Sequence, residues 1–182
     1  MTNCVLSYAW LKSPIGEIIV SACSKGVHQI QLSATSDPSR LERYQNNKVE
    51  VLKSEGVMNK PLTECTEWLS IYFSDLTAIT EHTLPPMHLT TTKPDSFTAS
   101  VWKTAIDKVP VGETVSYGEL AAMCGNPKAC RAVGGAMRSN QIPLLMPCHR
   151  VVGSHGNLGN YMSGKGLPIK KWLLKHEGVQ GY

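Results

Sequence analysis

The sequence predicts an α/β protein of the α+β type. It should have an N-terminal three-stranded antiparallel sheet with one covering helix, then a mostly helical C-terminal half that contains a helix-turn-helix. The first thirty residues alternate like strands and are interrupted by Ser-Pro-Ile-Gly and Ser-Lys-Gly turns. The second half instead repeats apolar residues at helical spacing. A proline-containing stretch at 75–95 separates the two patterns, so we expect domains at 1–92 and 93–182.

The N-terminal half is expected to be a meander covered by a helix. Strands are predicted at 4–11, 17–23 and 27–32, because tight-turn residues separate these runs. Residues 33–60 are polar and irregular and are expected to form a variable loop. Apolar residues recur at helical spacing over 62–73, which predicts a helix packed on the sheet.

Four helices are predicted in the C-terminal half, at 96–109, 116–125, 126–140 and 168–178. Gly125 should end the second helix, and Gly178 the last. Asn126 is the expected N-cap of the third, with Pro127 in its first turn. Two short helices separated only by Gly-Asn-Pro are typical of a helix-turn-helix.

Composition is that of a globular protein, with 42% hydrophobic and 18% charged residues among 182. No apolar run approaches the roughly 20 residues of a membrane span. The N-terminus lacks the features of a secretory signal, so the six cysteines are expected to be reduced thiols in the cytosol or nucleus.

Charge differs between the two halves. Residues 1–92 carry seven Lys and Arg against nine Asp and Glu, whereas 93–182 carry eleven against five. The basic second half suggests a polyanionic partner. Solvated lysines without a partner are the alternative.

Three possible metal ligands are expected to converge in the sheet. In a hairpin that turns at residues 13–14, Cys4 lies opposite Cys23, and in the next hairpin Cys23 lies opposite His28. Direct neighbours across antiparallel strands are about 4.5–5.5 Å apart. A tetrahedral zinc site would need a fourth ligand, for which His82 and His88 are candidates. The alternative is two buried cysteines and a surface histidine.

The third helix of the basic half combines cations with small residues. Lys128, Arg131 and Arg138 accompany Gly134 and Gly135, and each glycine costs a helix about 1 kcal/mol relative to alanine. Close approach of another backbone would offset that cost. A DNA strand and a packed helix of the same domain explain the glycines equally well.

Cys148 is the candidate nucleophile. A free thiol has a pKa of about 8.5 and becomes reactive only beside a base or cation. His149 adjoins it, but neighbouring side chains on an extended segment point to opposite faces, so a bridging water is plausible. Glu177, at the end of the last helix, is the candidate acid that orients the histidine. The alternative is an inert buried thiol.

Two runs carry a specific resemblance. PCHRV at 147–151 and GNPKACRAVGGAMRSN at 125–140 resemble the O6-alkylguanine-DNA alkyltransferase family. The N-terminal half resembles the animal members, including the pattern of Cys4, Cys23 and His28, with His88 at the fourth position. The resemblance implies DNA repair in which the protein transfers an alkyl group from guanine O6 to its own cysteine, once per molecule and without a cofactor for the chemistry. It also implies one structural zinc per chain, double-stranded DNA bound through its minor groove and a monomer in solution. Such a substrate predicts a nuclear location in a eukaryotic cell, and the lack of a membrane span predicts no membrane partner.

The same resemblance assigns roles to residues. Cys148 matches the alkyl acceptor, with His149 and Glu177 as the relay that generates its thiolate through a water. Tyr117 matches the proton donor to guanine N3, and Asn140 a hinge residue that bonds the backbone across a tight turn. Arg131 matches the arginine that fills the gap left when the base rotates out of the stack. Further DNA contacts carry over to Thr98, Gly118, Asn126, Arg138 and Ser154.

The guanine pocket implied by the resemblance comprises Met137, Pro143, Val151, Leu158, Gly159, Tyr161 and Ser163. Carbonyls of Cys148 and Val151 would accept from the exocyclic amine, and an N–H near Met162 or Ser163 would donate to O6. The segment around 162–168 is about two residues longer than the mammalian pattern, and Gly164 stands where a glycine would widen the pocket.

Two other classes of function remain open at this point. A helix-turn-helix protein without chemistry would suit the basic half but has no use for a thiol in PCHR. A thiol hydrolase would use Cys148, His149 and Glu177 but does not need an arginine-bearing recognition helix.

Overall fold

The computed structural model describes residues 4–33, 41 and 47–182 of the chain. Contacts divide the chain into two compact units, the first ending at Thr90 and the second running from Thr91 to Tyr182. No helix in the described part of the chain has the length and apolar character needed to cross a membrane.

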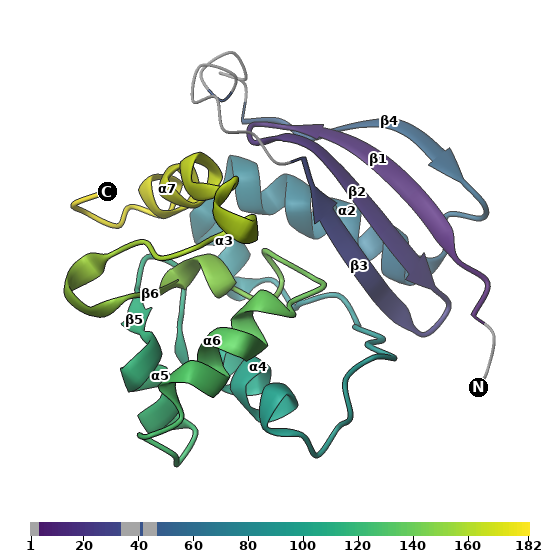
Figure 1. Ribbon diagram of the computed structural model, residues 1–182. Helices are drawn as coiled ribbons and strands as arrows, with labels where there is room; N and C mark the ends of the chain where they lie inside the picture. Colours follow the sequence, from purple (N-terminus) through teal and green to yellow (C-terminus); the bar gives the residue numbers. More distant parts are fainter. Residues whose placement is uncertain (1–3, 34–40, 42–46) are drawn as a thin grey trace. The chain divides into compact units, whose positions relative to one another are not determined.

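The first unit is a four-stranded antiparallel sheet covered by a helix. Strands β1 (Ser7–Ser13), β2 (Gly16–Cys23), β3 (Gly26–Leu32) and β4 (Glu50–Glu55) lie in the order β3-β2-β1-β4. Helix α2 (Lys60–Ser74) runs across the sheet (Figure 1) and buries its apolar side chains there. The side chain of Asn59 caps this helix and also donates to the Ala22 carbonyl, which fixes the start of the helix on β2.

Two elements lie where the sequence suggested irregular chain. Strand β4 falls inside the expected loop at 33–60, and the rest of that loop lies partly outside the described residues. All six β4 side chains are exposed, so this edge strand has no buried face to produce an alternating pattern. Helix α3 (Leu76–Glu81) falls inside the expected linker, where the Asp75 carboxylate accepts from the Thr77 and Ala78 amides.

The predicted hairpin registers are wrong. In the first hairpin Ser13 pairs with Gly16, so Cys4 lies beyond the paired residues and does not face Cys23. In the second hairpin Cys23 pairs with Gly26 rather than with His28, and the register shifts between Ser21 and Ala22. Both turns close over two residues, and a bulge in β3, where His28 is the unpaired extra residue, displaces the remaining pairs by one position.

The second unit contains α4 (Phe97–Lys108), α5 (Tyr117–Met123), α6 (Cys130–Arg138) and α7 (Leu167–His176). Two short parallel strands, β5 (Val115–Ser116) and β6 (Val151–Val152), join the start of α5 to the cysteine segment. Helices α5 and α6 form the helix-turn-helix (Figure 1). The Trp102 indole donates to the Ala136 carbonyl at 2.8 Å and so holds α6 against α4.

Asn126 is not the N-cap of α6. That helix begins at Cys130, with Ala129 as N-cap and no side-chain cap. The Asn126 amide instead donates to Ala121 and the Gly125 amide to Ala122, with Gly125 at φ +75°. This pair of bonds is a Schellman motif, which uses Asn126 to end α5 rather than to begin α6.

Candidate active site and DNA-binding surface

Cys148 lies at the start of a 3₁₀ turn, Cys148–Arg150, and not on the extended segment expected from the sequence. Its side chain lines a pocket of about 640 Å³, and only 8% of the residue is exposed. The Asn140 amide nitrogen lies 3.1 Å from both Cys148 Sγ and the Met146 carbonyl oxygen, while its Oδ1 accepts from the Ile142 amide. Asn140 therefore fixes the loop that leads to the cysteine and points a donor at the sulfur.

Behind the thiol lies a buried ionic network. His149 Nε2 is 2.8 Å from Glu177 Oε1, and neither side chain is exposed to solvent. Arg150 donates to both carboxylate oxygens of Glu177 at 2.9 and 3.0 Å, and its third contact is the Val109 carbonyl. Glu177 occupies the C-cap of α7, so the end of that helix brings the carboxylate to the histidine.

The network fixes which nitrogen of His149 can act as a base. Burial alone would raise the pKa of Glu177, but His149 and Arg150 outweigh burial and lower that pKa, so the carboxylate is ionised. Burial lowers the pKa of His149, which makes the ring neutral, with its proton on Nε2 toward Glu177. Nδ1 is buried and has no hydrogen-bond partner in the described part of the chain. That lone pair is the free proton acceptor.

Opposing effects set the acidity of the thiol. Burial raises the pKa of Cys148, whereas the Asn140 hydrogen bond, the charge of Lys170 and the Tyr161 hydroxyl act to lower it. Burial and the Cys148 charge raise the pKa of Tyr117, so its phenol keeps its proton at neutral pH. The pocket thus holds a thiol beside polar donors and a protonated phenol.

The pocket lining agrees with most of the residues expected from the resemblance. Met137, Pro143, Gly159, Tyr161 and Ser163 line it, together with Tyr117 and Asn140. Val151 and Leu158 do not line it: Val151 is fully buried, and the carbonyls of both residues accept from Lys170. Gly164 lies outside the lining as well, at φ +88°.

Sequence reasoning missed three residues of this region, namely Arg150, Asn160 and Lys170. Arg150 supports Glu177, Asn160 lines the pocket, and Lys170 is buried beneath it. A signal for Lys170 was present, because it falls three residues before Leu173 on the buried face of α7, where an apolar residue is expected. No comparable signal marks Asn160.

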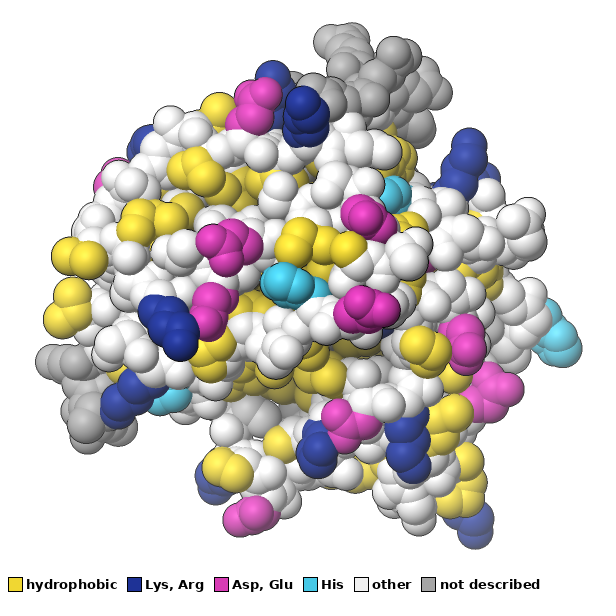
Figure 2. All heavy atoms as spheres, turned by 180° about the vertical axis from the view of Figure 1, so that it is seen from behind, with side chains coloured by type: hydrophobic (Ala, Val, Ile, Leu, Met, Phe, Trp, Pro, Cys, Tyr) yellow, Lys and Arg dark blue, Asp and Glu magenta, His cyan; other side chains and the backbone are white. Residues whose placement is uncertain are grey.

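The exposed face of α6 carries the expected cations. Arg131 and Arg138 are exposed, as is Lys128 in the preceding turn. A Cβ placed on Gly134 or Gly135 would meet nothing within 4 Å, so packing inside the protein does not explain these two glycines. Of the other expected DNA contacts, Asn126 and Ser154 are exposed, and Thr98 and Gly118 are half-buried. On the opposite face from that seen in Figure 1, basic and acidic side chains are mixed rather than separated into patches of one sign (Figure 2).

A separate cluster in the first unit has the composition of a metal site. One ligand atom each from Cys4, Cys23, His28 and His88 lie within 4.8 Å of one another. Cys23 Sγ is 3.1 Å from His28 Nε2 and 3.3 Å from His88 Nδ1, and Cys4 Sγ is 3.6 Å from the same His88 atom. Ligands of a tetrahedral zinc ion lie about 3.3–3.8 Å apart, and two thiolates with two imidazoles are a donor set that zinc prefers. The four side chains therefore fit the ion.

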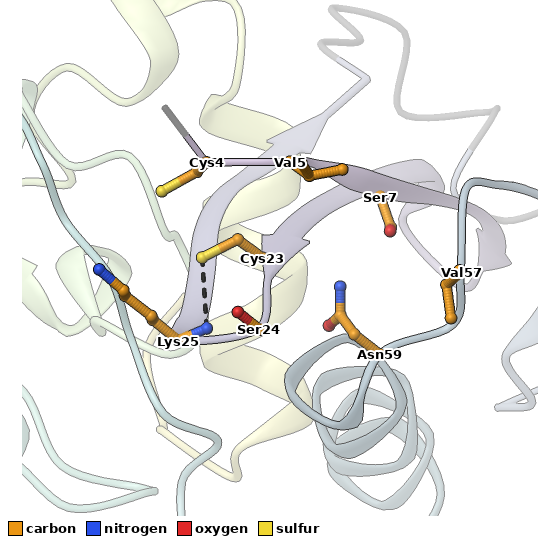
Figure 3. A pocket seen from close by; sticks show the side chains of 8 residues that line it. All are labelled: Cys4, Val5, Ser7, Cys23, Ser24, Lys25, Val57 and Asn59. Atoms are coloured by element: carbon orange, nitrogen blue, oxygen red, sulfur yellow. Dashed lines mark hydrogen bonds between the residues drawn. The ribbon is translucent and has the colours of Figure 1, made fainter. Parts of the chain in front are cut away.

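The 86–88 segment brings His88 to this cluster. The Val27 amide donates to the Pro86 carbonyl, and the His88 amide donates to the Val27 carbonyl, both at 2.8 Å. These two bonds dock the segment beside the β2–β3 turn. A Cβ on Gly26 would lie 2.7 Å from this backbone, so the approach requires glycine there. Cys4 and Cys23 also line a pocket of about 470 Å³ (Figure 3), whose rim includes Lys25. His82, the other candidate ligand, is not in the cluster.

Comparison with known proteins decides the family. Residues 96–179 match the DNA-binding domain of 6-O-methylguanine DNA methyltransferase, and residues 6–85 match the ribonuclease-like domain of the same proteins. A methylated-DNA–protein-cysteine methyltransferase of Mus musculus is 46% identical over 97% of this chain and 83% of its own length. The chain belongs to the O6-methylguanine DNA methyltransferase family.

Other members of the family are also similar to this chain in sequence or in structure. The Homo sapiens protein of the same description is 43% identical over 97% of this chain and 82% of its own length. The crystal structure of Mycobacterium tuberculosis O6-methylguanine methyltransferase superposes with a TM-score of 0.70 at 28% identity, covering 98% of this chain and 96% of the other. A Mycobacterium tuberculosis structure in complex with DNA covers 93% of this chain and 91% of its own, with a TM-score of 0.67 and 28% identity.

Family membership confirms the predicted fold class and the predicted activity. The protein binds DNA and repairs it by transferring an alkyl group to one of its own cysteines, a reaction that needs no cofactor. A DNA-binding regulator without chemistry and a thiol hydrolase are thereby set aside.

Proposed function

We propose that Cys148 is the acceptor and that it takes a methyl or larger alkyl group from O6 of guanine, once per molecule. One observation carries the assignment: Cys148 is the cysteine that lines the 640 Å³ pocket and that accepts from Asn140. Cys65, a buried cysteine on α2, has its pKa raised to about 12 by burial, and no side-chain amide in the described part of the chain donates to its sulfur as Asn140 does to Cys148.

The reaction uses the neighbouring groups in sequence. A bridging water carries the thiol proton to Nδ1 of His149, and the charge of Glu177 stabilises the imidazolium through Nε2. The thiolate attacks the alkyl carbon, so a C–S bond forms as the C–O6 bond breaks. Tyr117 gives its proton to guanine N3, because a neutral base leaves more easily than an anion. The phenolate then recovers a proton from the imidazolium, and the net proton passes from thiol to guanine.

The product is a thioether, and the relay has no means of breaking its C–S bond. The reaction is therefore stoichiometric. This consequence separates the family from a hydrolase, in which the acceptor sulfur would be regenerated.

Access to the base requires that it leave the stack. We propose that α6 enters the minor groove, where Gly134 and Gly135 allow close approach of the DNA backbone. Arg131 would fill the gap left by the rotated base and so offset part of the unstacking cost of a few kcal/mol. The exposure of Arg131 and the open space around both glycines support this geometry.

The cluster of Cys4, Cys23, His28 and His88 is proposed to hold one zinc ion. The ion would tie the β2–β3 turn to the N-terminal chain and the 86–88 segment, adding stability without taking part in transfer. We further propose that the protein acts as a monomer and resides in the nucleus of a eukaryotic cell, where its substrate lies.

Intact-protein mass spectrometry after incubation with a duplex containing O6-methylguanine tests the assignment. The protein should gain one methyl group, found on the peptide that contains Cys148. Cys148→Ala should gain none, whereas Cys130→Ala, which removes an exposed cysteine beside Arg131, should react as the wild type does. Methylation of another cysteine would overturn the choice of Cys148, and turnover without mass gain would indicate hydrolysis.

A further inference from the structure

Lys170 is a buried lysine that the proposed reaction does not use. It lies on α7 with 1% of its surface exposed, although lysine is among the residues least often buried. Its ammonium donates to the Val151 carbonyl at 2.7 Å and to the Leu158 carbonyl at 2.6 Å. Removing a cation from water costs free energy, so a buried lysine is expected to make interactions that an apolar side chain of the same size could not make.

The two carbonyls belong to different segments around the cysteine pocket. Val151 directly follows the Cys148–Arg150 turn and pairs with Val115, the residue before the α5 cap. Leu158 directly precedes Gly159, the first residue of the 159–163 segment that lines the pocket. A Cβ on Gly159 would lie 3.6 Å from the Tyr117 hydroxyl, so this segment also lies against the proposed proton donor.

We propose that Lys170 is a positioning residue that ties these two segments together and so keeps the pocket in the shape that receives the guanine. This inference rests on the proposed function of the pocket. It adds that one ammonium group beneath the pocket wall supplements the wall's own backbone hydrogen bonds. The wall does need support, because Met162 and Ser163 within it have positive φ, of 48° and 57°.

Lys170 is placed to support the transfer step rather than the binding of DNA. With 1% exposure it presents no charge to a DNA backbone, unlike Lys171, the next residue, which is exposed. Loss of Lys170 should therefore slow the reaction of bound substrate and leave duplex affinity unchanged. A residue that contributed only to folding would not separate these two quantities.

The test compares Lys170→Met, which keeps the length of the side chain but removes its donors, with Lys171→Met as the matched control. Single-turnover transfer from an O6-methylguanine duplex at saturation should fall at least tenfold in Lys170→Met, equivalent to about 1.4 kcal/mol of barrier. Duplex affinity, measured for both variants by anisotropy in a Cys148→Ala background, should stay within twofold of the wild type. Lys170→Arg, which keeps the charge and the donors, should recover part of the rate.

A second readout does not depend on the reaction. Hydrogen exchange of the DNA-free protein should show faster exchange at residues 159–164 in Lys170→Met but not in Lys171→Met. Transfer at the wild-type rate, or slower transfer without faster exchange, would overturn the positioning role. If Lys170→Met does not fold, Lys170→Gln takes its place. If the wild type itself gains no methyl group, the proposed function fails, and hydrogen exchange still decides whether Lys170 holds the wall.

Discussion

Glu177→Gln should lower both stability and reactivity, because one carboxylate holds two side-chain partners. Glu177 is buried and accepts from His149 at 2.8 Å and from Arg150 at 2.9 and 3.0 Å. An amide of the same shape can accept a hydrogen bond but leaves Arg150 as an uncompensated buried cation. Breaking a buried pair in this way costs about 3–5 kcal/mol. For a chain of this size, a loss of that magnitude lowers Tm by about 6–20 °C.

The pH dependence of this loss has a definite sign. The pKa of Glu177 is lowered in the folded protein, from an unfolded value of about 4.3. Its contribution is therefore complete above that pH and declines progressively as the pH falls from there toward the much lower pKa of the folded state. The gap in unfolding free energy between wild type and Glu177→Gln should be widest near pH 7 and should narrow toward pH 3.

Reactivity should fall with stability. Without the negative charge the imidazolium of His149 is no longer stabilised, and we expect transfer to slow by at least about 100-fold, the lower end of what a general base contributes. Glu119→Gln is the control, since Glu119 is exposed and a glutamine preserves its capping box. Thermal melts and single-turnover transfer measure both effects. If Glu177→Gln melts and reacts as Glu119→Gln does, the role given to the network is wrong.

Three further predictions concern the other parts of the site. Gly135→Ala should stabilise α6 by about 0.5–1 kcal/mol, because the added methyl group contacts no other atom of the protein. The same variant should bind duplex DNA severalfold more weakly, as measured by anisotropy. An unchanged affinity would show that DNA does not approach this glycine closely. Asn140→Ala should raise the pKa of Cys148, shifting the pH profile of iodoacetamide alkylation upward, whereas a downward shift would show that the amide does not favour the thiolate. Wild-type protein purified with zinc should contain about one ion per chain, and Cys23→Ala should lose the ion and have a lower Tm. If Cys23→Ala keeps its zinc while Cys124→Ala loses it, the proposed ligand set is wrong.

Elements with one buried face were predictable from the sequence. The meander, α2 and the helix-turn-helix all alternate buried and exposed positions, which is the signal that periodicity detects. Strand β4 has six exposed residues and owes its place to pairing with β1, so local sequence could not reveal it. Asn126 satisfies the local rules for both a helix end and a helix start, and only the hydrogen bonds distinguish them.

The Cys/His cluster of the first unit was predicted from strand pairings that the structure does not contain. The ligands converge not as cross-strand neighbours but because the 86–88 backbone docks on the turn at Gly26, a contact between residues about 60 positions apart. The expected pairings named Cys4, Cys23 and His28, and the family resemblance selected His88 over His82. The structure brings these four residues together, but in a register that the sequence did not reveal. Lys170 is the opposite case. Its position on the buried face of α7 was readable from the sequence, but the carbonyls that accept its hydrogen bonds were not.

In the proposed reaction the sulfur of Cys148 keeps the alkyl carbon. Carbon NMR of the protein mixed with an excess of a duplex carrying O6-¹³C-methylguanine follows that carbon. We expect one S-methyl resonance per chain, absent in Cys148→Ala, with no further transfer once every chain has reacted. A signal from ¹³C-methanol that keeps growing after one equivalent, or an S-methyl resonance that survives in Cys148→Ala, would contradict it.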